Sequence, residues 1–256
     1  QFAFNANQID GDNEMRFVPA VTANQGGATW WRITLNGTLM PTIIDGGTTF
    51  DGTAYNFQDP DQLRDTNTGN VGGDGGTIST VGSDAVSFSN FNRKELDIDT
   101  NDDPIFLINS PEGNINIREL GMFNGFGGFD EEMIQIQNNP GGVIENNFIG
   151  PFADGTTPSG NARGNIGIFF NDSNNSFSVD ILNNYIGFLR RTGIHSENED
   201  VFITVRGNEI FENSLDSDTD TDGISGAGNW TIEENLIRDV GTGTSSSFDG
   251  GAGIEI

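Results

Sequence analysis

The segment at residues 214–226 carries aspartates at every second position, namely Asp216, Asp218, Asp220 and Asp222. Gly223 follows the last of them. Alternating carboxylates that end in a glycine are typical of the first half of a calcium-binding loop, in which hard oxygen ligands surround the cation. Asn229 stands where an EF-hand loop would have its bidentate glutamate, which excludes a complete EF-hand. A looser Ca²⁺ site and a solvated acidic loop are the two hypotheses for this segment.

A second acidic cluster lies at residues 97–104 and contains Asp97, Asp99, Asp102 and Asp103. Ile98 stands between the first two aspartates, and this alternation predicts a strand with one polar face. We favour a solvated strand face here, with a metal site as the alternative.

His195 and two arginines are the remaining candidates for chemistry. His195 is the single histidine and no nucleophile is evident beside it, so we interpret it as an inert outward side chain. Arg118 and Arg206 are candidates for the cationic base with which a polysaccharide lyase removes a proton. The repeat described next stacks them on Glu145 and Glu233, and we favour exposed ion pairs worth about 0.2–1 kcal/mol each.

These residues belong to a repeat with a period of about 30 residues. A first slot holds an apolar residue at Ile105, Ile134, Ile168, Ile194, Ile224 and Ile254. A second slot holds Asn147, Asn184, Asn208 and Asn235, with Leu120 in the same place one unit earlier. Each of these asparagines has an apolar residue three positions before it and two positions after it.

The repeat predicts an all-β, right-handed parallel β-helix, which is a single-stranded β-solenoid. No unit is long enough to close a core alone, so stacking of the coils must bury the apolar slots as one column. The recurring asparagines are expected to form a hydrogen-bonded ladder from coil to coil, at about 4.8 Å spacing. The alternative is an antiparallel sandwich in which the asparagines recur by chance. The 20 phenylalanines are expected inside the coils.

The chain is predicted to be a single β-helix domain over 1–256. Residues 1–8 are interpreted as the end of a capping helix, with Phe2 and Ala6 on one face. Irregular first coils follow at 13–100, and regular coils at 101–256. Both ends look cut, so we expect a fragment of a longer chain or ends that pair head-to-tail with other copies.

Composition narrows the possible partners and the setting. The 38 acidic residues outnumber the 11 basic ones, giving a net charge of −27, which repels nucleic acids. No run of about 20 apolar residues predicts membrane insertion. The absence of cysteine excludes disulfides and thiol chemistry, and it fits an extracytoplasmic microbial protein.

Loop lengths indicate where a ligand could bind. Long loops are expected at 151–165, 212–222 and 239–251, on one side of the solenoid. Side chains expected near this surface are Phe152, Arg163, Arg190, Arg191 and Phe248.

Three stretches resemble a known family: residues 13–55, beginning NEMRFVPAV; residues 143–176, beginning VIENNFIG; and the first seven residues. They are similar to the secreted right-handed parallel β-helix repeat family, the pectate-lyase-like solenoids of bacterial and archaeal surface and adhesin-like proteins. The resemblance implies a secreted or cell-surface location and carries over no catalytic residue.

The sequence therefore favours a non-enzymatic structural or adhesive β-helix, which would serve as a spacer, as a glycan- or surface-binding module, or as a subunit of an extracellular filament. The alternative is a polysaccharide lyase or glycoside hydrolase. A lyase needs a cation and a base, and a hydrolase needs paired carboxylates at a defined separation. Outward carboxylates are too abundant in this sequence for a catalytic pair to be picked out.

Overall fold

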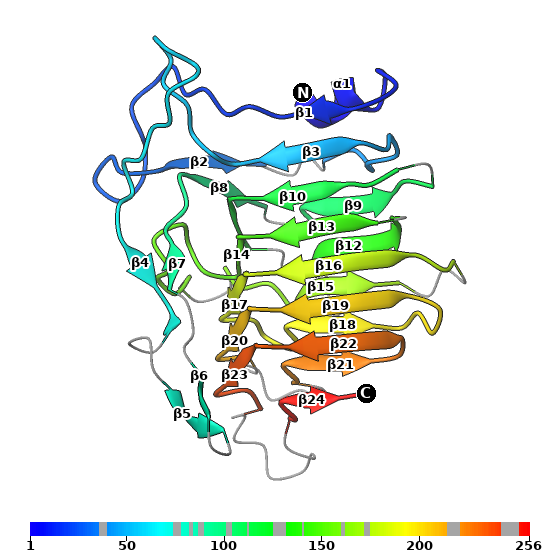
Figure 1. Cartoon of the computed structure of the whole chain (residues 1–256). Coiled ribbons are helices and arrows are strands. Elements are labelled where there is room, and N and C mark those ends of the chain that lie inside the picture. Colours follow the sequence, from blue (N-terminus) through cyan, green and yellow to red (C-terminus); the bar gives the residue numbers. More distant parts are fainter. Residues whose placement is uncertain are drawn as a thin grey trace.

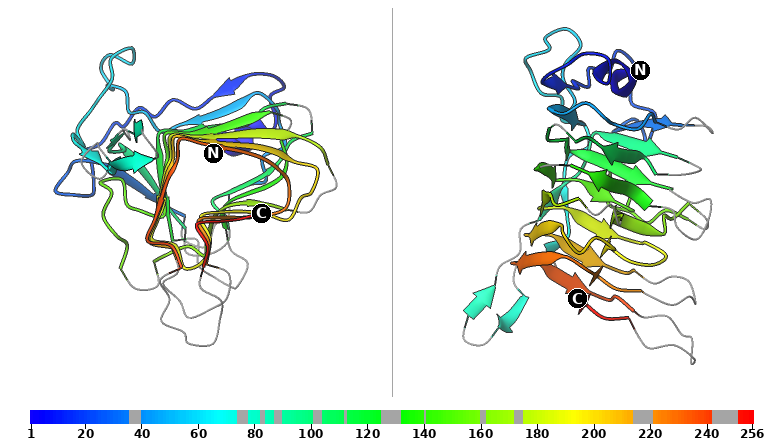
Figure 2. Two further views of the ribbon diagram at one scale, coloured as in Figure 1. Left: turned by 60° about the horizontal axis from the view of Figure 1, so that its bottom comes forward. Right: turned by 90° about the vertical axis from the view of Figure 1, so that its right-hand side faces the viewer.

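The chain winds into a right-handed parallel β-helix, which confirms the predicted fold class (Figures 1 and 2). The structure is a computed structural model. It describes residues 1–35, 40–73, 78–81, 84–86, 90–100, 104–111, 113–124, 132–139, 141–159, 162–171, 175–213, 221–241 and 251–256, and of 78–81 and 84–86 the backbone alone.

Each regular coil contributes one strand to each of three parallel sheets, in the order sheet I, sheet II, sheet III. Sheet I contains β9 (Phe106–Asn109), β12 (Glu132–Asn138), β15 (Ile166–Phe170), β18 (Ile194–Ser196), β21 (Ile224–Gly226) and β24 (Ile254–Glu255). Sheet II contains β1 (Asn13–Glu14), β3 (Thr48–Asp51), β10 (Asn116–Arg118), β13 (Gly142–Glu145), β16 (Ser178–Leu182), β19 (Phe202–Arg206) and β22 (Asn229–Glu233). Sheet III contains β2 (Trp31–Thr34), β8 (Leu96–Asp99), β11 (Leu120–Phe123), β14 (Phe148–Ile149), β17 (Tyr185–Gly187), β20 (Glu209–Phe211) and β23 (Leu236–Arg238).

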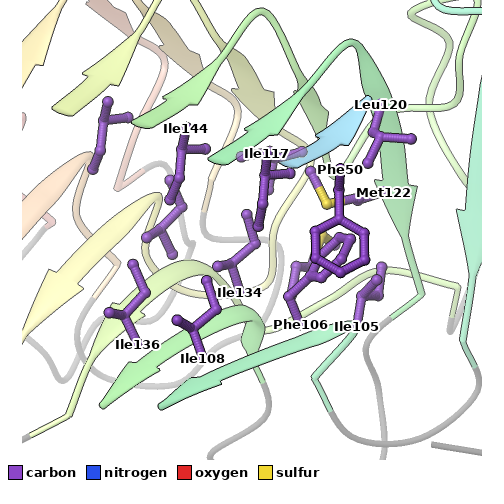
Figure 3. Packing of buried hydrophobic residues seen from close by; sticks show 14 of the residues in the cluster. Phe50, Ile105, Phe106, Ile108, Ile117, Leu120, Met122, Ile134, Ile136 and Ile144 are labelled. Carbon is purple, nitrogen blue, oxygen red and sulfur yellow. The ribbon is translucent and has the colours of Figure 1, made fainter. Parts of the chain in front are cut away.

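The repeated apolar slots form the core, as the sequence predicted. Ile134, Ile168, Ile194 and Ile224 follow one another in register along sheet I and have no exposed surface. Figure 3 shows the neighbouring isoleucines pointing into the tube from facing sheets. The sequence placed Ile105 in this slot wrongly. Its true occupant on the preceding coil is Phe106, which pairs with Ile134. The segment PIFLI has consecutive apolar residues, so alternation does not fix its register.

The asparagine ladder is confirmed at the corner between sheets II and III. The Asn184 Oδ1 accepts hydrogen bonds from the backbone N–H and the Nδ2 of Asn147, at 2.9 and 3.1 Å. The Asn184 Nδ2 donates to the Ile144 carbonyl at 2.8 Å and to the Asn208 Oδ1 at 3.0 Å. Asn235 continues the same pattern below Asn208. These bonds satisfy backbone groups that the corner takes out of the sheets.

The N-terminal helix α1 (Phe2–Ala6) packs on the first coils, as expected for a cap. Ala3 and Ala6 are buried. The Phe2 ring meets the Phe50 ring edge-on, with 5.3 Å between centroids. Phe2 and Ala6 therefore both face the solenoid, and the helix covers apolar side chains at this end of the column.

A long insertion between β3 and β8 folds back over the outer face of sheet III (Figure 1). Its backbone forms two antiparallel pairs, which are β4 (Asn70–Val71) with β7 (Phe91–Asn92) and β5 (Ile78–Val81) with β6 (Asp84–Val86). Phe91 and Val71 cover a second apolar cluster, made of Phe148, Tyr185, Phe188 and Phe211. The expectation that the phenylalanines lie inside the coils is therefore wrong for these rings.

Glu209 fixes the insertion to sheet III. Its side chain is buried and accepts a hydrogen bond from the Gly73 N–H at 2.7 Å. Its other oxygen accepts two hydrogen bonds from Arg238, at 2.7 and 3.0 Å. Hydrogen bonds between charged groups are shorter and stronger than those between neutral groups. Gly72 lies so close that a Cβ there would overlap the Glu209 carboxylate.

Candidate functional site

The outer face of sheet I carries a row of polar and aromatic side chains. Each of its members follows an inward isoleucine of the repeat, and the row pairs in register through Gln135, Phe169, His195, Ser225 and Glu255. The Phe169 and His195 rings are parallel within 4°, with 5.7 Å between centroids. The His195 Nδ1 lies 2.9 Å from the Ser225 Oγ. His195 is thus an outward residue with partners on both neighbouring coils.

A groove of about 340 Å³ opens across this row. Strands β12, β15 and β18 supply its floor, and the corners before and after them supply its walls. The side chains that define its chemistry are Glu132, Gln135, Phe169, Arg191, His195 and Glu197. Glu132 is buried and Glu197 is exposed, so the groove has one enclosed and one solvent-facing carboxylate.

The sequence identified part of this groove. His195 and its ladder neighbours follow from the repeat, and Arg191 was among the side chains expected at a binding surface. Glu132 was missed, because it belongs to a different coil and only the stacking brings it near Arg191. Glu197 was not among the residues expected at a binding surface. Glu197 lies two residues after the outward His195, and this spacing is the signal that places both side chains on the same face.

The other residues expected at the binding surface do not gather there. The Phe152 ring packs edge-on against the Phe123 ring of sheet III, with 4.7 Å between the ring centroids. The Arg163 Nε donates to the Pro158 carbonyl at 3.2 Å, within its own loop. Arg190 lies beside Arg191 in the corner before β18 but does not line the groove. Phe248 lies outside the described residues. The loops at 151–165, 212–222 and 239–251 each lead from sheet III to sheet I, which places their attachment points on one side.

The two candidate bases are in the predicted register, Arg118 beside Glu145 and Arg206 beside Glu233. The Arg118 guanidinium, however, binds earlier coils. Its Nε donates to Asp51 at 2.9 Å, and a terminal nitrogen lies 3.2 Å from Glu14. Burial alone would lower the pKa of Arg118, but the carboxylates of Asp51 and Glu14 raise it above its ordinary value. A base must give up its proton before it can accept one, so this environment makes Arg118 a poor base.

The predicted calcium residues are mostly beyond the described part of the chain. Asp216, Asp218 and Asp220 lie outside it, as do Asp102 and Asp103 of the second cluster. Asp222 is described and buried, and its Oδ1 accepts a hydrogen bond from the Ala252 N–H at 2.7 Å. Within the described residues, no group of three or more His, Cys, Asp or Glu side chains is placed to hold a metal ion. Calcium binding therefore stays a prediction.

Asp97 does not lie on the solvated face that was expected. It is fully buried, and its Oδ2 accepts hydrogen bonds from the Trp30 Nε1 and from Arg32, both at 2.9 Å. Burial raises the pKa of Asp97 to about 6, although Arg32 opposes the shift. A Cβ at Gly121 would overlap the Asp97 carboxylate, so the next coil must have a glycine there. Asp97 thus links β8 to β2 through its contact with Arg32.

A second cavity, of about 330 Å³, lies where the insertion leaves the coils and includes Glu95 and Glu119 in its lining. Burial raises the pKa of Glu95, against hydrogen bonds from Asn67 and Thr66 that lower it. Those bonds occupy both carboxylate oxygens of Glu95, at 2.7–2.9 Å. Glu119 is 2.7 Å from the buried ammonium of Lys94. Both carboxylates thus have structural partners.

Comparison with known proteins finds no matching family model, no similar curated protein and no similar solved structure. Among the described residues, no helix is long and apolar enough to cross a membrane. The functional argument therefore rests on the residues themselves.

Proposed function

We propose that this chain is a non-enzymatic structural and adhesive β-solenoid of a secreted or cell-surface protein. It would be a member of the secreted parallel β-helix repeat family that its coils resemble. The observation that carries the proposal is the engagement of Arg118, one of the two candidate bases, with Asp51 and Glu14. Arg118 acts as a structural cation that joins three coils, which suits a rod and not a proton-transfer site.

The continuous ladder through Asn147, Asn184 and Asn208 also supports a rigid rod. Buried, fully paired polar columns hold successive coils in one register. The lack of cysteine and the net charge of −27 suit a soluble extracellular surface. The proposal includes head-to-tail assembly into filaments, which electron microscopy of the purified protein would detect as particles longer than one chain.

The adhesive part of the proposal is tested by binding. The purified chain, displayed on beads, should adhere to glycan-coated or cell-derived surfaces and should release no soluble saccharide from them. Failure to adhere to any such surface would reduce the function to that of a spacer. Release of soluble fragments would contradict the non-enzymatic assignment.

A glycoside hydrolase is the alternative, and the cavity that holds Glu95 and Glu119 is the observation that favours it. A carboxyl group with a raised pKa can act as a general acid, and a second carboxylate is needed as base or nucleophile. Glutamine at either position should abolish product release from polysaccharides if this alternative holds. An unchanged product yield in Glu95→Gln and Glu119→Gln would exclude this cavity as the catalytic site.

A further inference from the structure

The cavity of about 330 Å³ at the root of the insertion has a lining that is rich in hydrogen-bond donors. Its volume is at the lower end of the range for small-molecule sites, so it suits a small ligand. The lining side chains that can donate to such a ligand are Thr53, Arg64, Asn70, Asn92 and Arg93. We call this space the insertion cavity.

Arg93 is the residue that points to a ligand. Within the described part of the chain, its guanidinium forms no ion pair, and its Nε is buried without a hydrogen-bond partner. Arg32 also has an unpaired Nε, but one of its terminal nitrogens contacts Asp97 at 2.9 Å. Buried donors without a partner are rare in native proteins. In a chain with 38 acidic and 11 basic residues, a cavity arginine that no described carboxylate neutralises is placed to receive an anion from outside.

The backbone holds Arg93 in a fixed place beside the cavity. Its N–H donates to the Gly69 carbonyl at 3.0 Å, and the N–H of Lys94 donates to the Ala153 carbonyl at 2.8 Å. A Cβ at Gly69 would lie 3.7 Å from the Cζ, the Nε and one terminal nitrogen of Arg93, so the guanidinium lies flat against this glycine. The planar fork is therefore positioned before a ligand arrives, which lowers the entropic cost of binding.

Two asparagines at the base of the insertion add both donors and acceptors. Asn70 of β4 and Asn92 of β7 lie directly opposite each other in the antiparallel pair, and both are exposed. Neither side-chain amide forms a hydrogen bond with another residue that the structure describes. The Thr53 hydroxyl belongs to the same lining. Amides and hydroxyls suit the hydroxyl groups of a ligand, whereas a guanidinium suits a carboxylate.

Three carboxylates also line the cavity, and two of them already have partners. Both oxygens of Glu95 accept hydrogen bonds from a loop of the insertion, and Glu119 lies 2.7 Å from the Lys94 ammonium. Asp65 is exposed, so solvent and salt screen its charge. A ligand with a single negative charge can therefore bind at Arg93. A dianion such as sulfate meets more repulsion from these carboxylates and from the net charge of −27.

We propose that the insertion cavity binds a small hydroxylated carboxylate, such as a sugar acid. The ligand carboxylate accepts hydrogen bonds from the Arg93 guanidinium, and its hydroxyls contact Asn70, Asn92 and Thr53. A free sugar acid and the uronate at the end of a glycan share this chemistry. The inference goes beyond the proposed adhesive function, because a free small molecule can fill the cavity without any surface to adhere to.

Titration calorimetry of the full chain tests the proposal, with galacturonate as the probe and galactose as the control ligand. The two sugars differ only at C6, which is a carboxylate in the first and a hydroxymethyl group in the second. We expect galacturonate to bind and galactose not to bind. Arg93→Gln should weaken galacturonate binding about tenfold, because a charge-assisted hydrogen bond is lost. Arg206→Gln removes the same charge from an exposed position outside the cavity and should leave binding unchanged.

Two further variants keep the test decisive if Arg93→Gln alters the fold. Arg93→Lys keeps the charge and loses the planar fork, so it should weaken binding by a smaller factor than glutamine does. Asn92→Ala truncates an exposed side chain and should weaken binding about threefold. Urea denaturation shows whether each variant remains folded.

Four results would overturn the inference: galacturonate does not bind, galactose binds equally well, sulfate binds as tightly as galacturonate, or the folded Arg93 and Arg206 variants behave alike. Trigalacturonate distinguishes the two sources of the ligand. Tighter binding of the trimer than of galacturonate identifies the end of a glycan, weaker binding identifies a free sugar acid, and both support the site. These outcomes are independent of adhesion to surfaces, which the bead assay measures separately.

Discussion

Asn184 illustrates how one residue type fixes the geometry of a coil. It is fully buried, and its amide reaches Asn147 on one side and Asn208 on the other. The residue before it, Asn183, has a φ of 53°, in the left-handed region that asparagine tolerates better than most residues. The pair Asn183–Asn184 thus makes a two-residue corner in which one residue turns the chain and the next binds the adjacent coils.

Replacement of Asn184 with alanine should lower the free energy of unfolding by about 3 kcal/mol. The change leaves the Asn147 N–H and the Ile144 carbonyl buried without the partners that Asn184 gives them. Urea denaturation measures the loss. Asn90→Ala is the control, because Asn90 is exposed and should tolerate the change. Equal stabilities of the two variants would mean that the ladder contributes nothing.

Asp97 makes the stability of the solenoid depend on pH. Its folded-state pKa of about 6 lies above the ordinary value of 3.8, so the folded protein binds more protons between these values. Stability from this group is therefore greatest at low pH and falls as pH rises to about 6, by about 3 kcal/mol in total. Asp97→Asn, which stays neutral, should gain stability relative to the wild type between pH 4 and pH 7. Denaturation at several pH values measures the difference in free energy of unfolding between the two proteins. If that difference stays constant between pH 4 and pH 7, the buried carboxylate does not ionise as this account requires.

At the scale of elements, the inward side of the coils was predictable and the outer cover of sheet III was not. Apolar slots such as Ile168 and Ile194 repeat locally, so their burial follows from the sequence. Tyr185 and Phe211 sit at outward positions and are buried by Phe91, which comes from an insertion about 100 residues away in the chain. No local period encodes such a contact. The sheet I groove was only partly predictable. The row that contains Phe169 and His195 follows from the repeat, whereas Glu132 and Arg191 do not occupy repeated positions.

The insertion should be sensitive to added volume at Gly72. Gly72 and Gly27 have nearly equal φ values, of 74° and 75°, so alanine adds similar backbone strain at both. A Cβ at Gly72 would also overlap Glu209, whereas one at Gly27 would meet open space. We expect Gly72→Ala to cost about 1–3 kcal/mol more than Gly27→Ala. Hydrogen exchange should show faster exchange at β4 and β7 in the Gly72 variant alone, and equal exchange would argue against the close contact.

At the scale of the whole molecule, the net charge of −27 sets what the chain can approach and bind. Self-repulsion on this scale destabilises the compact state and is relieved by bound cations. The alternating aspartates at 214–222 were predicted to provide such a cation site. Ca²⁺ binding there would stabilise the folded chain by mass action.

Thermal melts test the calcium prediction. The melting temperature should be higher in millimolar Ca²⁺ than in chelator, and Mg²⁺ should have a smaller effect, because an oxygen-rich loop suits the larger cation. A variant with asparagine at residues 216, 218 and 220 should lose the difference. Identical melts of the wild-type chain in Ca²⁺ and in chelator would mean that the aspartates form only a solvated loop.

The central claim is that this solenoid holds saccharides and does not cleave them. Mass spectrometry of an oligosaccharide recovered after long incubation with the full chain tests it most directly. The account predicts that the oligosaccharide remains associated with the protein and is recovered at its original mass. Shortened products, lost again in Glu95→Gln, would contradict the account and identify the chain as a glycan-cleaving enzyme.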